Sequence, residues 1–241
     1  MNQRSRLASP ASGGRVADIV TGRGFDRLVN FTDAVAAIAV TVLVLPLTSL
    51  TRVGSQQTVW DLIGDNSGQV TSFFFTFVVV ALMWGVHNRV INGIRGYDGA
   101  IFWLNIGWIA TIAFLPWPTS LYGEAIGIGS TSVGEFSGGE GLGGVGLFYW
   151  CTLAAGSAFG SLMAVHIRRH PELLLTSTVG TTTPDWRERW RGPVFAAFFV
   201  SVGLVSIVAP AVASWMPLVI IPLSIVLRPG NDDVGATASA E

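Results

Sequence analysis

The sequence predicts an all-α integral membrane protein with six transmembrane helices per chain. Half of its 241 residues are hydrophobic and only 12% are charged, which is about half the charged share of an ordinary soluble domain. Several runs without a charge approach or exceed the ~20 residues that a helix needs to cross the hydrocarbon core of a bilayer. Membrane insertion follows from these two observations.

Four apolar stretches predict one span each, covering residues 34–51, 70–88, 100–118 and 142–166. The first lies between the charged residues Asp33 and Arg52. The third is expected to stop at Pro116 and Pro118, because proline lacks the backbone N–H that a helix interior needs. Each stretch suits a single crossing.

Residues 193–227 form a run of 35 residues without a charge. This run is too long for one crossing and just sufficient for two short ones separated between Pro210 and Pro217. We predict a tight hairpin that supplies the fifth and sixth helices. One span followed by a re-entrant segment is the alternative, since a broken helix is tolerated where neighbouring protein satisfies the backbone.

The positions of the arginines predict the orientation. All 14 basic residues are Arg, and in a six-helix arrangement all except Arg52 fall on the side of both termini. Cytoplasmic loops carry an excess of basic residues. We therefore expect a multi-pass protein of the cell (plasma) membrane with a cytoplasmic lead at 1–27, a transmembrane domain at 28–228 and a disordered cytoplasmic tail at 229–241.

Asp33 stands at the mouth of the first apolar stretch, where a carboxylate is costly unless it is paired. A local interpretation is a helix N-cap formed by Thr32 or Asp33. The second span ends with Trp84 and His87, one turn apart on one helix face and on the same side of the membrane as Asp33. We expect a cluster of Arg27, Asp33, Trp84 and His87.

These residues belong to a longer pattern: an Arg, three residues, a Phe, a Ser or Thr and an Asp, followed by a helix rich in Val, Ala and Ile. With it the chain resembles the endosomal and lysosomal potassium channel family, the transmembrane protein 175 type, as a bacterial homologue. The resemblance is specific in the first three spans. The matching residues are Arg27, Phe31, Thr32 and Asp33, then Trp84 and His87, then Asn105 and Pro116.

The resemblance implies a potassium-selective, leak-type cation channel. First helices from several copies would line the pore, and one six-helix repeat per chain implies a homotetramer. The implied pore-lining and selectivity positions are Ile38, Thr41, Val42 and Leu45. The implied structural network comprises Arg27, Phe31, Asp33, Trp84, His87 and Asn105. The helical spacing of the pore positions agrees with one face, although without the resemblance Ile38 and Leu45 would indicate ordinary packing.

The resemblance also implies how ions would pass. The chain contains no Thr-Val-Gly-Tyr-Gly segment, so a filter of backbone carbonyls of that kind is absent. Conduction would depend on a narrow apolar ring, with K⁺ as the permeant ion and no cofactor or metal. The expected partners are further copies of the chain, monovalent cations and membrane lipids, and the net charge of −1 gives no field for nucleic acid.

A proton-coupled or proton-conducting transporter that uses Asp33 and His87 is the alternative function. It would need more membrane-embedded polar residues than Asp33, Asn105 and Thr111 supply.

An enzyme or haem protein, with His87 and His166 as axial ligands, is a further alternative. Both histidines lie at span ends, too shallow for a buried haem. Catalytic signatures are otherwise missing, and the single Cys151 excludes an intrachain disulfide or a cysteine-based metal site. The sequence therefore predicts that the protein is not an enzyme.

Overall fold

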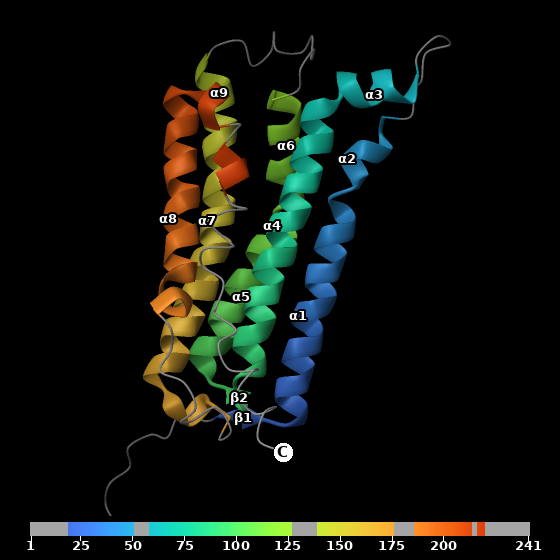
Figure 1. The fold of residues 1–241 in the computed structure, drawn as a ribbon. Coiled ribbons are helices and arrows are strands. Elements are labelled where there is room, and N and C mark those ends of the chain that lie inside the picture. The colour runs from blue at the N-terminus through green and yellow to red at the C-terminus, as the bar shows by residue number, and fades with distance from the viewer. Residues whose placement is uncertain (1–18, 51–57, 127–138, 176–185, 214–215, 220–241) are drawn as a thin grey trace, which may run out of the picture.

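A computed structural model describes residues 19–50, 58–126, 139–175, 186–213 and 216–219. Long helices run side by side in a bundle (Figure 1). Four helical stretches are long and apolar enough to cross a membrane: 23–48, 67–92, 99–126 and 143–169. These coincide with the four single spans predicted from the sequence, so the chain is a helical, multi-pass membrane protein.

The helices are α1 (Arg23–Val42), α2 (Leu45–Thr48), α3 (Val59–Asp65), α4 (Ser67–Asn92), α5 (Gly99–Phe114), α6 (Pro116–Ile126), α7 (Gly139–Arg169), α8 (Trp186–Val208) and α9 (Pro210–Ala213). Single 3-10 turns, η2 and η3, cover Pro171–Leu173 and Met216–Val219, and two short strands are β1 (Val20–Thr21) and β2 (Gly96–Tyr97). The first span consists of α1 with α2, and the third of α5 with α6.

The predicted end of the third span at Pro116 and Pro118 is wrong. Pro116 opens α6, which continues to Ile126. Proline is tolerated in the first turn of a helix, where its missing N–H would have no partner anyway. The N–H of Thr119 bonds to the carbonyl of Leu115 at 3.1 Å, so the prolines interrupt the span without ending it.

The predicted hairpin at 193–227 is found only in its first half. Its fifth helix is present as α8, a single helix to Val208 that contains Pro193. The short α9 and η3 follow. The sixth helix was placed largely on residues that lie outside the described ones, so it stays a prediction.

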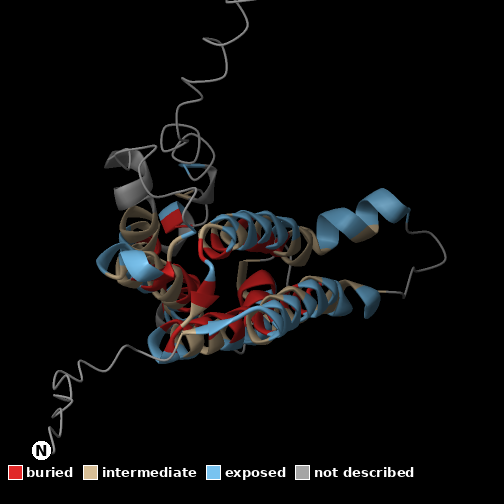
Figure 2. Cartoon of the chain, turned by 90° about the horizontal axis from the view of Figure 1, so that it is seen from below, coloured by how far each residue is buried: buried red, intermediate tan, exposed pale blue. Residues whose placement is uncertain are grey.

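The helices pack around a core of large aromatic side chains. Trp108 from α5, Tyr149 and Trp150 from α7, and Phe199 from α8 are each at most 2% exposed. The ring of Tyr122 from α6 stacks on that of Tyr149 at 4.6 Å between centroids. Seen along the bundle, the buried residues face inward, while α1 and α4 leave long exposed faces (Figure 2).

At the end of the bundle where α1 begins, the chain forms a small sheet. β1 and β2 pair antiparallel, with Val20 opposite Tyr97 and Thr21 opposite Gly96. Because β1 ends immediately before α1, this pair fixes where the first membrane helix starts.

The close contact between α6 and α4 generates a stability prediction. A Cβ atom added at Gly123 would meet the Oγ of Ser72 and, at 2.9 Å, the Cα of Gln69. We expect Gly123→Ala to destabilise the folded chain by about 1–3 kcal/mol, because backbone cannot move aside as a flexible side chain can. Thermal melting of the detergent-solubilised protein measures this change.

Gly144→Ala in α7 is the matched control, since nothing lies within 4 Å of a Cβ at that position. Equal melting temperatures for the two variants would contradict the close packing of α6 against α4.

Candidate functional site

The face of α1 that the sequence assigns to a pore is exposed along its length. Phe31 is 53% exposed, Ile38 61% and Leu45, at the start of α2, 57%. Thr41 lies on the same face and is also exposed, whereas Val42 is half-buried on its flank. The opposite face packs into the bundle through Leu28, Thr32, Ala36, Ala39 and Leu43. The helix therefore presents an apolar face that no described part of the chain covers, called the unpartnered face below.

Hydroxyl groups interrupt this apolar face. The Oγ1 of Thr41 donates to the carbonyl of Ile38 at 2.7 Å. The Oγ1 of Thr48 and the Oγ of Ser49 bond in the same way to the carbonyls of Leu45 and Pro46, at 2.7 and 2.6 Å. Since each proton is used by the helix, each oxygen turns its lone pairs outward as an acceptor. Such oxygens can contact a passing cation. Thr48 and Ser49 were not predicted, although they continue the same helical spacing.

Asp33 lies within α1, which begins at Arg23, so the N-cap interpretation of Thr32 or Asp33 is wrong. The indole Nε1 of Trp84 donates to Oδ1 of Asp33 at 2.8 Å. This bond joins α4 to α1, and it is the contact between the first and second spans that the sequence led us to expect.

Arg27 does not join this pair. It is exposed, and no described residue forms an ion pair or hydrogen bond with it. Arg27 and Asp33 are six residues apart on a regular helix, which rotates by about 100° per residue, so their side chains leave the helix on different faces. The predicted four-residue cluster is therefore incomplete.

His87 contacts Asn105 rather than Asp33. Its Nε2 lies 2.7 Å from the Oδ1 of Asn105, and the Nδ2 of Asn105 donates to the Oγ1 of Thr32 at 2.7 Å. The Oγ1 of Thr32 in turn donates a hydrogen bond to the carbonyl of Leu28 at 2.8 Å. This chain of bonds runs from α4 through α5 to α1, and all three of its side chains are buried.

The His87 ring also stacks on the indole of Trp108, with 4.2 Å between centroids and 20° between the planes. Because the Oδ1 of Asn105 can only accept, the Nε2 of His87 donates this bond. His87 therefore holds helices together. Trp108 was not among the predicted residues, although it stands three residues after Asn105 on the same face of α5.

The comparison with known families shows what the first three spans are similar to. Residues 27–116, from the start of the Arg27 motif to the first residue of α6, match the family described as "Endosomal/lysosomal potassium channel TMEM175". The resemblance to the TMEM175 family is confirmed. Members of this family are ion channels, not enzymes, so the expectation of a non-enzyme agrees with it.

Individual relatives agree with the family match. A potassium channel of Streptomyces collinus is 29% identical over 98 residues, which is 41% of this chain and 47% of the relative. The human endosomal/lysosomal proton channel TMEM175 is 30% identical over 95 residues, 39% of this chain and 19% of the relative. The matched part of the chain thus spans less than half the length of these relatives.

A solved structure supports the fold beyond the matched segment. The crystal structure of a lysosomal potassium-selective channel TMEM175 homolog from Chamaesiphon minutus superposes with a TM-score of 0.62 at 18% sequence identity. It covers 86% of this chain and 100% of that chain. The fold of this chain is therefore similar to that of the solved channel.

The buried chain of hydrogen bonds generates a second prediction. Asn105→Leu keeps the volume of the side chain but leaves His87 and Thr32 without their partner inside the bundle. We expect a loss of folding stability of about 1–2 kcal/mol, measured as a lower melting temperature in detergent.

Trp84→Phe is the comparison variant, because it removes the hydrogen-bond donor to Asp33 and retains an aromatic ring at this position. Trp84 is 38% exposed, so water can replace the lost bond and the melting temperature should fall less. A larger loss in Trp84→Phe than in Asn105→Leu would contradict the assignment of Asn105 as the central tie.

Proposed function

We propose that this chain is a potassium-selective, leak-type cation channel whose pore is lined by α1 from each copy of a homotetramer. The observation that carries the proposal is the unpartnered face of α1, on which Phe31, Ile38 and Leu45 are each more than half exposed. All three residues belong to the first span, which holds the family's motif. The proposed pore-lining residues are Ile38, Thr41, Val42 and Leu45.

A pore of this kind works through an apolar constriction. Rings of Ile38 and Leu45 would form narrow passages where an ion loses part of its hydration, and dewetting of the same rings would close the pore. The oxygen of Thr41, between the two rings, would replace some of the lost water. Selectivity would then depend on the width of the rings and on how well these hydroxyl oxygens substitute for water.

The charged residues would act around this pore rather than in it. Asp33, held by Trp84, would orient α1. Asn105, held by His87, would fix the buried face of the same helix through Thr32. We further propose that residues 28–228 form one transmembrane domain with six helices, that both termini are cytoplasmic and that the chain resides in the cell membrane. The distribution of arginine supports this orientation.

Proton conduction is the second candidate, because the human relative is named a proton channel. A proton route through Asp33 and His87 would require these residues to exchange protons. In the structure His87 bonds to Asn105 and Asp33 bonds to Trp84, so no described contact joins them. This geometry favours the potassium channel, and parallel K⁺ and H⁺ flux assays separate the two functions.

Flux through the reconstituted protein tests the proposed pore. We expect Ile38→Asn to change the rate or selectivity of K⁺ flux, because a polar ring holds water at the constriction. Leu45→Ala should do the same by widening the second ring. K⁺ and Na⁺ flux into proteoliposomes is the measurement.

Val40→Ala is the matched control on the same helix. Val40 packs against the core on the side of α1 away from Ile38, so its truncation should lower stability and leave selectivity unchanged. Unaltered flux in both Ile38→Asn and Leu45→Ala would remove the pore assignment.

Assembly tests the role of Asp33. We expect Asp33→Ala to reduce the yield of tetramer more than it changes ion preference, because the lost carboxylate leaves the Trp84 indole unpaired and removes the bond between α1 and α4. Light scattering of the detergent-purified protein gives the yield, and Asp33→Asn, which keeps an acceptor, should be milder. A normal tetramer with altered selectivity would overturn this division of roles.

A further inference from the structure

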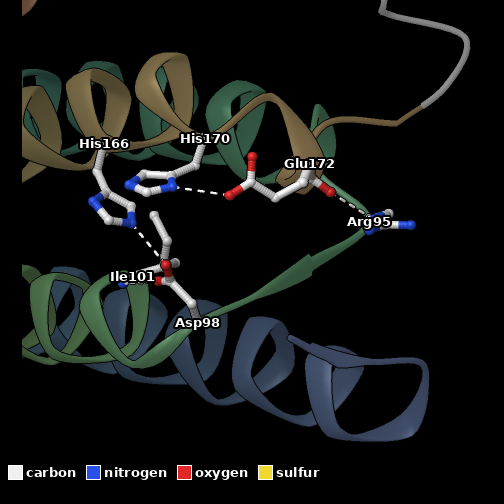
Figure 3. A network of polar contacts seen from close by, with 6 residues as sticks. All are labelled: Arg95, Asp98, Ile101, His166, His170 and Glu172. Carbon is white, nitrogen blue, oxygen red and sulfur yellow. Dashed lines mark hydrogen bonds and ion pairs between the residues drawn. The ribbon is translucent and has the colours of Figure 1, made fainter. Parts of the chain in front are cut away.

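A second polar cluster lies at the end of the bundle where α1 begins (Figure 3). Asp98 caps α5, with its Oδ1 accepting the N–H of Ile101 at 2.8 Å. Its Oδ2 lies 2.7 Å from the Nε2 of His166, in the last turn of α7. His170 follows one turn later, with its ring centroid 4.3 Å from that of His166 and its Nδ1 2.9 Å from the Oε1 of Glu172. Two imidazoles thus face two carboxylates.

Backbone bonds hold the same segments together. The N–H of Arg95 bonds to the carbonyl of Leu173 at 2.9 Å, and the N–H of Leu175 bonds to the carbonyl of Gly93 at 3.1 Å. The Nε of Arg95 donates to the carbonyl of Glu172 at 2.7 Å. The connection between α4 and α5 therefore rests on the residues that follow α7.

The other edge of this connection reaches α1. Asp98 directly follows β2, and β2 pairs with β1, which directly precedes α1. The rings of Tyr97 in β2 and Phe25 in α1 lie 6.4 Å apart. Gly96 lies so close to β1 that an added Cβ would meet the carbonyl oxygen of Val20. A displacement of Asp98 would therefore be passed through β2 to the start of α1.

Imidazole is the side chain whose charge ordinarily changes between about pH 5 and 8. Burial opposes ionisation of Asp98, but the Ile101 N–H and His166 outweigh it and hold the pKa of Asp98 below its ordinary value. The backbone N–H of Glu172 and the His170 contact lower the pKa of Glu172. Both acids therefore stay charged over this range.

His166 contacts Asp98, the N-cap of α5, and the ring of His170, which lies between α7 and η2. His170 contacts the carboxylate of Glu172 in η2, and the backbone carbonyl of Glu172 accepts a bond from Arg95. Tyr97 turns to the rings of Phe25 and Phe102 instead. Both histidine side chains reach solvent, at 22% exposure for His166 and 41% for His170. Protons from the aqueous phase can therefore reach them.

We propose that His166, His170, Asp98 and Glu172 form a proton-responsive clasp, which holds the β1–β2 pair and the start of α1 more tightly as the pH falls from about 8 to 5.5. Protonation turns each imidazole–carboxylate contact into a charge-assisted bond, about twice as strong as a neutral one. The proposal rests on the proposed function only in treating α1 as the pore helix.

The tightening has an acid limit. The pKa of Asp98 is lowered by folding, so its contribution to stability is complete above the ordinary carboxyl range. That contribution is lost only as the pH falls through the lowered value. Asp98 therefore sets the lower end of the pH window in which the clasp responds.

Hydrogen exchange of the full chain in nanodiscs tests the clasp directly. At pH 5.5 and pH 8, and after correction for intrinsic rates, we expect the amides of residues 19–25 and 93–97 to be about fivefold better protected at the lower pH, the effect of about one added net hydrogen bond. The double variant His166→Gln with His170→Gln retains polar side chains but cannot titrate, and it should lose this difference. Glu124→Gln, which changes an exposed carboxylate on α6, should keep it.

Gly96→Val tests the route to α1. Its added side chain should break the β1–β2 pairing, so residues 93–97 should keep their pH response while residues 19–25 lose theirs. Asp98→Asn, which keeps the cap on α5, should weaken the response in both segments. This variant decides the question if the double histidine variant fails to fold.

Equal protection at the two pH values in the unmodified chain would overturn the proposal, as would an unchanged response in the double histidine variant. K⁺ flux measured in parallel tests the channel function independently of the clasp. If the exchange response is found and no variant conducts K⁺, the clasp stands and the channel assignment fails.

Discussion

A polar group inside a bilayer must find its partner within the protein, and the rotation of α1 depends on one such partnership. The side-chain amide of Asn105 accepts a hydrogen bond from His87 and donates one to Thr32. Both bonds can form only if Thr32 points into the bundle. With about 100° per residue, this orientation places Ile38 and Leu45 about 220–240° away from Thr32. The buried amide thus decides which residues of α1 face outward.

Small side chains make this orientation compatible with close packing. Ala36 and Ala39 occupy the buried face of α1 beside Thr32, and helices in membranes approach closely where such residues meet. Glycine serves the same purpose between α5 and α7, where a Cβ at Gly107 would meet the ring of Phe159 at 2.5 Å. The buried face of α1 is therefore closely packed, while its outward face has no partner among the described residues of the chain.

The sequence predicted what depends on local composition and missed what depends on distant partners. The four long spans followed from apolar runs, and the Trp84–Asp33 bond followed from helical spacing and orientation. The N-cap interpretation of Asp33 failed because the start of α1 is set by the pairing of β1 with β2, two strands far apart in sequence. His87 was assigned to Asp33 because no local pattern shows that the amide of Asn105 lies closer. Pro116 was read as a stop because sequence alone does not show that a new helix begins at that residue.

The exposed face of α1 does not by itself require a second copy of the chain, because lipid covers apolar side chains without cost. Its hydroxyls are also satisfied, since Thr41, Thr48 and Ser49 donate to their own helix. The charged residues in the first turns of α1 are different. A carboxylate can accept about four hydrogen bonds, and among the described residues Asp33 receives one, from Trp84. Arg27, on the same outward face as Phe31 and Ile38, has no described partner. Groups of this kind need water or another polar surface beside them, and a hydrated pore mouth at the start of α1 would supply both.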